Sequence, residues 1–325
     1  MIHIVNMDHF AKLRCTVELA HAVVGAQQTG LLGRLGDTTD TVDGHAAALD
    51  LYSEGVAKLL PILVDSGFAV RDGDRYGPSD GLRALVDKTP HGLGGLTRVW
   101  DHLPAYLRTG EPMMRANGVR TERQRVYAGV VAALGKMFAP SATALAAALA
   151  PIEPRTVLDV GAGSGVWSLA LASVVPELRV TALDLEPVLA AFRTRAAELG
   201  LADRVSTVAQ SFHDEPLGAG SYDVVLLAAV LHLEPPLSAA ALITRASRAV
   251  APAGRLVIVD ALRGRGADAL PRSLYAMNLA LRTRGGAPHD EDAIVGWLRD
   301  ARAVAIDRVD LPFPGLGALV ATMPG

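Results

Sequence analysis

The stretch VLDVGAGSGVW, residues 157–167, decides the fold of this chain. Its glycines stand at positions 161, 163 and 165, between an apolar run typical of a buried strand and an apolar helical pattern. Glycines at such a strand-to-helix turn let the backbone approach a bound ligand closely. About 20 residues further on, Asp184 ends a second strand-like run, where a carboxylate can accept hydrogen bonds from both ribose hydroxyls. The turn and the acid together predict a nucleoside-containing ligand.

The length of the glycine turn favours one such ligand. Residues 161–165 form a GxGxG pattern, whereas dinucleotide sites use a longer GxGxxG turn that places a pyrophosphate on the helix N-terminus. The shorter turn leaves room for a small zwitterionic tail, and S-adenosylmethionine (AdoMet) has such a tail and no phosphate. The pattern therefore predicts AdoMet. A NAD-dependent oxidoreductase is the alternative, which a titration with NADH against S-adenosylhomocysteine would separate.

Strands and helices alternate after Pro151 and Pro154, which mark a domain boundary. Such alternation predicts an α/β, Rossmann-like domain whose parallel sheet is covered by helices on both faces. Two further strand-like runs near the C-terminus, joined by PFPG at 312–315, predict a closing antiparallel strand. The expected strands are TVLDVG (156–161), RVTALD (179–184), VSTVA (205–209), DVVLLA (223–228), RLVIVDA (255–261), AVAIDRVDL (303–311) and GALVATM (317–323).

The N-terminal part has a different pattern. Apolar spacing predicts three helices, at 13–35, 44–51 and 53–66, and then a hairpin with an Asp72-Gly73 turn. This order is typical of a winged helix. Pro61 is expected to bend or shorten the third helix. A Gly-rich loop at 91–96 and an Ala-rich helix at 122–149 follow. We expect a winged-helix-like domain at 1–110, connecting helices at 111–150 and a cofactor domain at 151–325.

Composition excludes several classes of partner. The net charge of −3 gives no attractive field for nucleic acid or anionic membranes, and residues 1–110 hold 10 Lys and Arg against 13 Asp and Glu. A DNA-binding winged helix is therefore disfavoured. No apolar stretch is long enough to span a membrane. One cysteine, Cys15, and an N-terminus without a signal-peptide pattern predict a cytoplasmic protein. We expect no metal site.

Eight segments match one known family: DRYGPSD (74–80), LRTGEP (107–112), KMFAPSA (136–142), VLDVGAGSG (157–165), LDLEPVL (183–189), YDVVLLAAVLH (222–232), PAGRLVIVDA (252–261) and LYAMNLALRTRGG (274–286). Over nearly its whole length the chain resembles the class I AdoMet-dependent O-methyltransferases that carry an N-terminal winged-helix dimerisation domain. That family includes the plant caffeate and acetylserotonin type and many bacterial enzymes of secondary metabolism. The resemblance implies a homodimer that pairs through its N-terminal helices.

The resemblance also implies a set of cofactor contacts. The backbone of Gly161, Ala162 and Gly163 would contact the methionine part of AdoMet, Asp184 the ribose and Leu185 the edge of the adenine.

Four more positions match the family's pocket. Met137 and Ser141 match residues at the methionine end, although core packing is an equally ordinary role for Met137. Ser211 replaces an acid that would accept from the adenine amine. Phe212 is still able to stack on the adenine ring.

The expected base is His232, which follows the fourth strand of the sheet, where open α/β sheets place their ligands. The family motif is His-Asp-Trp, and its histidine takes the proton of a substrate hydroxyl. Here Leu233 and Glu234 replace the Asp and the Trp. Two acids orient the histidine in the family. Asp260 matches the first, while Pro288 replaces the second.

Three other residues have open roles. His289 and Asp290 are alternatives for the second acid by their position, but surface positions in a loop are the more ordinary interpretation. Asn278 matches a position that faces the substrate, and a solvent-facing helix position is its alternative.

These features favour methyl transfer to a small aromatic secondary metabolite. O-methylation of a hydroxyl is the first hypothesis, and C- or N-methylation of an electron-rich ring such as an indole, or of a keto acid, is a second. An AdoMet-binding relative that catalyses decarboxylation, hydroxylation or a pericyclic step is the alternative, because only half of the acid pair survives.

Overall fold

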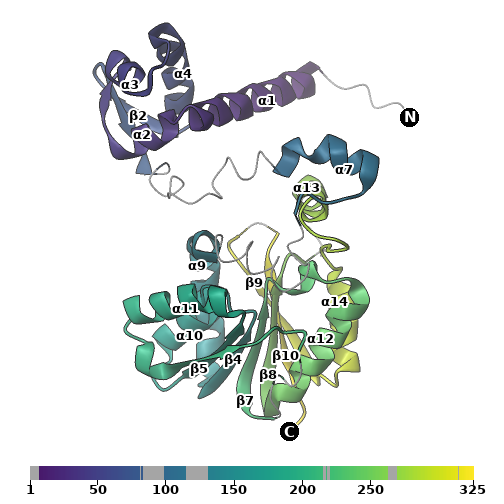
Figure 1. Ribbon diagram of the computed structural model, residues 1–325. Coiled ribbons are helices and arrows are strands. Elements are labelled where there is room, and N and C mark those ends of the chain that lie inside the picture. The colour runs from purple at the N-terminus through teal and green to yellow at the C-terminus, as the bar shows by residue number, and fades with distance from the viewer. Residues whose placement is uncertain are drawn as a thin grey trace. The chain divides into compact units, whose positions relative to one another are not determined.

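The computed structural model describes residues 7–80, 82, 99–114, 131–214, 217, 220–262, 269–313 and 315–325 (Figure 1). It divides into two compact units, Met1–Asp101 and His102–Gly325. The helix expected from residue 122 is described from Val131 and packs its buried Ala142 and Leu145 into the core of the second unit. The predicted loop at 91–96 and the start of that helix lie outside the described residues.

The first unit combines helices with a small sheet. Its elements are α1 (Met7–Gln28), α2 (Leu31–Asp37), β1 (Asp40–Thr41), α3 (Val42–Leu49), α4 (Ser53–Asp65), β2 (Ala69–Asp72) and β3 (Arg75–Pro78). The strands pair antiparallel in the order β1-β3-β2. Leu31, Leu35, Leu60 and Leu63 are fully buried and form its core.

Three local expectations in this unit need correction. The helix expected at 13–35 is two helices, because the chain breaks at Gly30, whose φ of 81° is open to glycine without strain. Pro61 does not shorten α4, which continues to Asp65, while the expected bend stays a prediction. The proline lies on the exposed face, where water can satisfy the backbone carbonyl left without a partner. The hairpin turn is Gly73-Asp74, one residue later than expected, since Asp72 pairs with Arg75.

The second unit is a seven-stranded sheet between helices. Its strands are β4 (Thr156–Val160), β5 (Arg179–Asp184), β6 (Val205–Ala209), β7 (Tyr222–Ala228), β8 (Val250–Asp260), β9 (Ala305–Asp310) and β10 (Gly317–Thr322). They lie in the order β6-β5-β4-β7-β8-β10-β9. The first five are parallel, and β10 pairs antiparallel with both β8 and β9, which confirms the expected closing strand.

Helices cover both faces of this sheet (Figure 1). Side chains of α9 (Val131–Leu149), α10 (Val166–Val174) and α11 (Glu186–Glu198) form one core, and those of α12 (Pro236–Ala249) and α14 (Glu291–Asp300) form the other. The remaining described helices are α7 (Leu103–Thr109), α13 (Ala269–Ala280) and the 3₁₀ turns η1 (Ala150–Ile152), η2 (Ala202–Arg204) and η3 (Leu231–Leu233). The strand order reverses between β4 and β7, and ligands of open α/β sheets bind at such a point.

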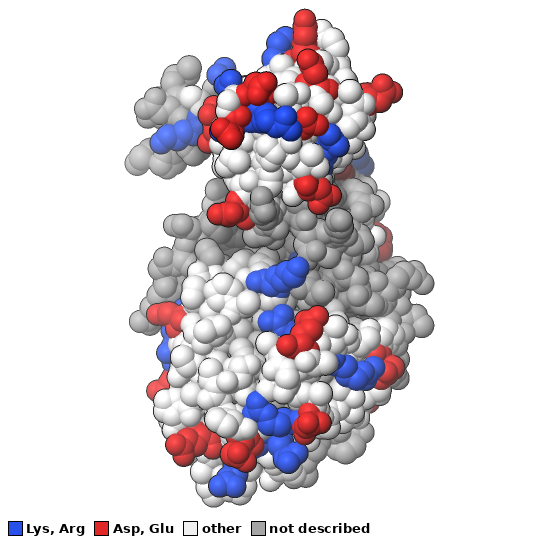
Figure 2. Space-filling view, turned by 90° about the vertical axis from the view of Figure 1, so that its left-hand side faces the viewer, with Lys and Arg blue, Asp and Glu red and all other residues white. Residues whose placement is uncertain are grey.

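The surface carries both signs of charge. Figure 2 shows Lys and Arg next to Asp and Glu on the face in view, and pairs such as Arg34–Asp40 and Arg193–Glu186 neutralise each other locally. Among the described residues, no helix is long and apolar enough to cross a membrane. The same part of the chain holds no group of three or more His, Cys, Asp or Glu placed to bind a metal ion.

Candidate active site

The turn after β4 needs its glycines for conformation and for space. Gly161, Gly163 and Gly165 all have positive φ, at 73°, 58° and 71°. A Cβ on Gly161 would lie 2.9 Å from Val230 Cγ1, and one on Gly165 would lie 2.4 Å from Phe192 Cδ2. Any other residue would therefore strain the backbone and push neighbouring side chains away. The turn stays open on its ligand side because no side chain stands there.

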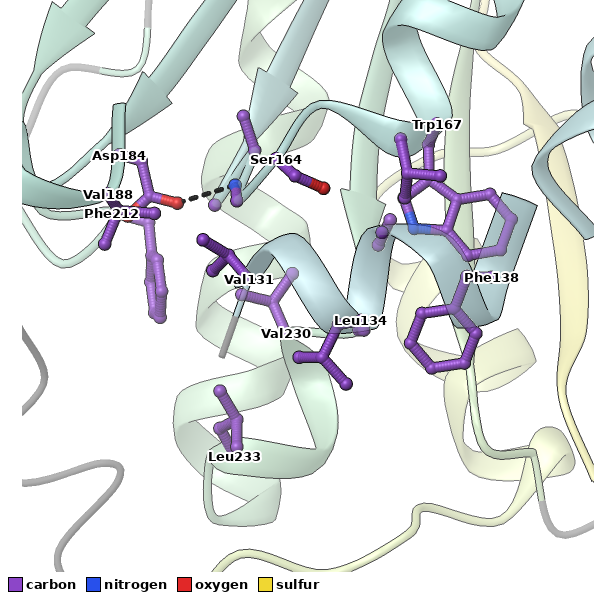
Figure 3. Close-up of a pocket in the computed structure, with 17 residues that line it drawn as sticks. Val131, Leu134, Phe138, Ser164, Trp167, Asp184, Val188, Phe212, Val230 and Leu233 are labelled. Carbon is purple, nitrogen blue, oxygen red and sulfur yellow. Dashed lines mark hydrogen bonds between the residues drawn. The ribbon is translucent and has the colours of Figure 1, made fainter. Parts of the chain in front are cut away.

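Asp184, at the end of β5, is tied to this turn. Its Oδ2 accepts a hydrogen bond from the Gly163 N–H at 2.8 Å, and its Oδ1 accepts one from the Leu185 N–H at 2.7 Å (Figure 3). These bonds fix the carboxylate at the edge of the cavity. Carboxylate oxygens have further acceptor capacity, so the fixed group can still accept from ribose hydroxyls.

A cavity lies between the glycine turn, α9 and η3. Its empty volume is about 640 Å³, part of which is open to solvent. Figure 3 shows Asp184, Val188 and Phe212 at one end and Phe138 and Trp167 at the other. The lining consists of Val131, Leu134, Gly135, Phe138, Gly161, Ala162, Gly163, Ser164, Val166, Trp167, Asp184, Val188, Phe212, Ala228, Ala229, Val230 and Leu233. An apolar cleft with backbone amides and one carboxylate suits a nucleoside with a small polar tail, as AdoMet has.

Five of the nine expected cofactor residues line this cavity, namely Gly161, Ala162, Gly163, Asp184 and Phe212. The other four do not. Leu185 is buried beneath the cavity beside Val188. The Ser211 hydroxyl accepts from the His213 N–H at 3.2 Å and stabilises its own turn.

Met137 and Ser141 also lie outside the lining. Met137 is 45% exposed, and Ser141 is buried, with its hydroxyl accepting from the Phe313 N–H at 3.1 Å. The lining positions of α9 instead recur at 131, 134, 135 and 138, one face of the helix. Helical periodicity could have indicated Leu134 and Phe138, but only the docking of α9 shows which face meets the cavity.

Asp159 is a buried carboxylate that the sequence analysis missed. It lies in β4 just before the glycine turn, is 1% exposed, and accepts from the Ser168 hydroxyl at 2.5 Å. Burial, together with the nearby negative charge of Asp184, raises its pKa to about 7 against the opposing hydrogen bonds from Ser168. Its place two residues before Gly161 in the motif was a signal that could have been used.

His232 and Asp260 meet as expected. His232 lies in η3, directly after β7, and Asp260 ends the neighbouring strand β8. The ring Nδ1 is 2.6 Å from Asp260 Oδ1, and the backbone N–H of His232 donates to Oδ2 at 3.1 Å. Burial acts to raise the pKa of Asp260, but the charge and hydrogen bonds of His232 and the Ala261 N–H hold it below the usual value. Asp260 is therefore an ionised partner for the imidazole.

Position 288 offers no second acid, and His289 does not replace it at the ring. Pro288 is buried, and Asp290 is exposed at the start of α14. His289 is also buried, which corrects the expected surface position: its Nε2–H donates to the Leu231 carbonyl at 2.9 Å, and its ring meets Trp297 edge-on. The hydrogen bond from His289 thereby holds the backbone of η3 in place.

Helix α13 places one aromatic side chain against His232. Tyr275 packs edge-on against the His232 ring, with 5.8 Å between centroids. Asn278, one turn further along, is 9% exposed, so the alternative of a solvent-facing position is wrong.

Comparison with known proteins agrees with this geometry. Residues 157–254 match a family model described as a methyltransferase domain. The chain is 27% identical to the tetracenomycin polyketide synthesis 8-O-methyl transferase TcmO of Streptomyces glaucescens, over 77% of this chain and 78% of that protein. It is 38% identical to the aclacinomycin 10-hydroxylase RdmB of Streptomyces purpurascens, over 49% of this chain but only 44% of RdmB.

Solved structures show the same fold along the chain. Human N-acetylserotonin methyltransferase in complex with SAM superposes with a TM-score of 0.79 at 18% identity, covering 100% of both chains. An O-methyltransferase family protein from Burkholderia thailandensis gives 0.79 at 22% identity, with 98% of each chain covered. With the glycine turn, the fixed Asp184 and the His232–Asp260 pair in place, the chain carries a methyltransferase domain, is similar along its length to O-methyltransferases, and uses AdoMet as its cofactor.

Proposed function

We propose that this enzyme methylates a hydroxyl oxygen of a small aromatic secondary metabolite, with His232 as the base. The names of its relatives support the substrate class: TcmO acts in polyketide synthesis, and another relative, from Streptomyces sahachiroi, is a 3-hydroxy-5-methyl-1-naphthoate 3-O-methyltransferase. One observation carries the proposal. Asp260 holds the buried ring of His232, and η3, the turn that contains His232, also supplies Leu233 to the cofactor cavity.

The pairing determines which ring nitrogen can act. Asp260 is ionised and accepts only, so Nδ1 carries the ring proton of neutral His232 and donates it. Nε2 then has the free lone pair, and within the described residues it has no hydrogen-bond partner. When bound, AdoMet supplies a methyl group already activated by its sulfonium. As the hydroxyl oxygen takes the methyl group, the carbon–sulfur bond of the sulfonium would break and S-adenosylhomocysteine would leave. Nε2 accepts the hydroxyl proton, and Asp260 stabilises the imidazolium.

Substitution of His232 tests this assignment. We expect His232→Ala to lower kcat by about 10² to 10⁴, the usual contribution of a positioned base, with little change in S-adenosylhomocysteine affinity. Asp260→Asn should cost less, because the imidazole remains but is poorly oriented. Turnover of candidate phenols with AdoMet, followed by product mass, measures both. If His232→Ala keeps nearly full activity, methylation of an electron-rich carbon or nitrogen, which needs positioning more than a base, replaces O-methylation.

Helix α13 supports a substrate contact. Because Tyr275 touches the His232 ring and Asn278 follows one turn later, we propose that the Asn278 amide faces the substrate and hydrogen-bonds a carbonyl or hydroxyl.

A second candidate function is AdoMet-dependent chemistry without methyl transfer. Pro288 in place of an acid and the similarity to a hydroxylase, RdmB, both favour it. Product mass separates the two, since a gain of one methylene means transfer.

The proposed unit of function is a homodimer. The first unit would act as a winged-helix-like dimerisation domain, with residues 111–150 as connecting helices, because Phe10, Leu13 and Val17 form an exposed apolar stripe on α1. We also propose a cytoplasmic location, which the free, exposed Cys15 supports and cell fractionation would test.

A further inference from the structure

Two residues from separate loops meet in space. His213 lies in the loop after β6, and Glu234, which stands where the family motif has Trp, directly follows η3. His213 Nε2 lies 3.1 Å from Glu234 Oε1, which makes an ion pair when the imidazole is protonated. A polar contact thus joins the two loops.

Burial makes this pairing specific. The Glu234 side chain is 6% exposed, whereas that of His213 is 38% exposed. A buried carboxylate is costly unless a donor satisfies it, and His213 supplies one from the solvent side. The backbone of His213 is held as well, since Arg245 of α12 donates to its carbonyl at 2.9 Å.

Both members of the pair adjoin residues that line the cofactor cavity. Phe212 precedes His213, and their ring centroids are 4.6 Å apart; Leu233 precedes Glu234. Phe212 also approaches the glycine turn, where a Cβ on Gly161 would lie 3.6 Å from its ring. Figure 3 shows Phe212 at the Asp184 end of the cavity. Holding His213 therefore holds the aromatic wall beside the carboxylate that we assign to the ribose.

We propose that His213 and Glu234 form a clamp that fixes Phe212 in the AdoMet cavity and thereby sets the affinity for the cofactor. The clamp rests on the assignment of this cavity to AdoMet. Both residues act through Phe212, so they are positioning residues. A loop ordered before binding loses less conformational entropy on binding, which is the source of the expected affinity.

Calorimetry with S-adenosylhomocysteine tests the clamp. His213→Phe keeps a ring beside Phe212 but removes the polar contact with Glu234, and we expect it to raise Kd about tenfold, the order expected for a lost interaction with a charged group. Glu234→Gln keeps the shape and a weaker acceptor and should raise Kd about threefold. The double variant should match His213→Phe alone, because the contact between positions 213 and 234 is already lost in that single variant. Glu198→Gln, an exposed change on α11, is the control.

Two further measurements separate a clamp from a general structural role. In a Phe212→Ala background, His213→Phe should cause no further loss of affinity, and kcat at saturating AdoMet should change less than about twofold in the single variants. Unchanged Kd in both single variants, or losses that multiply in the double variant, overturn the proposal. Glu234→Gln gives the answer if His213→Phe does not fold. Because the readout is binding, a wild type that binds S-adenosylhomocysteine but methylates no phenol would contradict only the proposed reaction.

Discussion

Two buried aspartates near the site, Asp159 and Asp260, differ in pKa because their partners differ. Asp260 faces His232, and the attraction keeps its pKa low despite burial. Asp159 is buried with only a hydroxyl as its partner, so burial and the negative charge of Asp184 raise its pKa to about 7 despite the hydrogen bond from Ser168. Residue type alone says nothing of this difference, which comes from the groups that folding places within a few ångströms.

The raised pKa of Asp159 predicts a pH-dependent stability. The folded chain retains a proton on Asp159 up to about pH 7, whereas an unfolded aspartate loses it near pH 4, so the folded state binds more protons between these values. The free energy of unfolding should therefore fall as pH rises through this window, by up to about 1.4 kcal/mol per pH unit, and level off above pH 7. Urea unfolding from pH 5 to 8 measures it.

Asp159→Asn is the matched control. Asparagine can still accept from the Ser168 hydroxyl but does not titrate, so the variant should lack this part of the slope and gain stability relative to wild type as pH rises. Equal slopes for the two proteins would show that Asp159 is ionised throughout.

At the scale of elements, a short 3₁₀ turn places His232, the proposed base, and the segment before α14 supports that turn. A Cβ on Gly286 would lie 2.8 Å from the His232 carbonyl oxygen, so only glycine permits this approach. His289 adds a hydrogen bond to the Leu231 carbonyl. Gly286 and His289 thus fix the backbone of η3. Asp260 fixes the ring and the backbone N–H of His232.

Removal of the His289 hydrogen bond should lower the rate and spare cofactor binding. His289→Ala leaves the Leu231 carbonyl without its donor, and a misplacement costing about 1.4 kcal/mol in the transition state lowers kcat about tenfold. His289→Gln retains a donor and should recover most of the activity. Steady-state kinetics and S-adenosylhomocysteine titration check this. A fall in cofactor affinity equal to the fall in kcat, or a Gln variant no better than Ala, would rule out a positioning role.

At the scale of the whole molecule, the exposed apolar stripe on α1 argues for self-association. Leu13 and Val17 are 54% and 47% exposed, and with Phe10 they lie on one face at helical spacing. We expect light scattering at about micromolar concentration to give the mass of a dimer, because apolar stripes of this kind mark partner surfaces.

Charge placed on the stripe should separate the copies. Leu13→Glu with Val17→Glu should shift the mass toward that of a monomer, whereas Val70→Glu, an equally exposed apolar position on β2, should not. A monomeric wild type would contradict the proposed dimer, and so would a double variant that stays dimeric.

The sequence by itself determined the sheet and the chemistry at its strand ends. Hydrophobic periodicity and turn-forming residues located each strand of the second unit, because these signals are local. The glycine motif and the family resemblance placed Gly161, Asp184, His232 and Asp260 at strand ends, which converge at one edge of the sheet. Short-range errors, such as the break at Gly30, arose where a single φ outweighed apolar spacing.

Only the tertiary structure decided what depends on packing between distant segments. Which face of α9 meets the cavity, and so why Leu134 and Phe138 line it while Met137 does not, follows from how that helix packs on α10. The pairing of His213 with Glu234 and the burial of His289 behind η3 join residues 21 and 58 positions apart. No periodicity encodes such contacts, because they depend on the order of the strands in the sheet and on the packing of the loops between them.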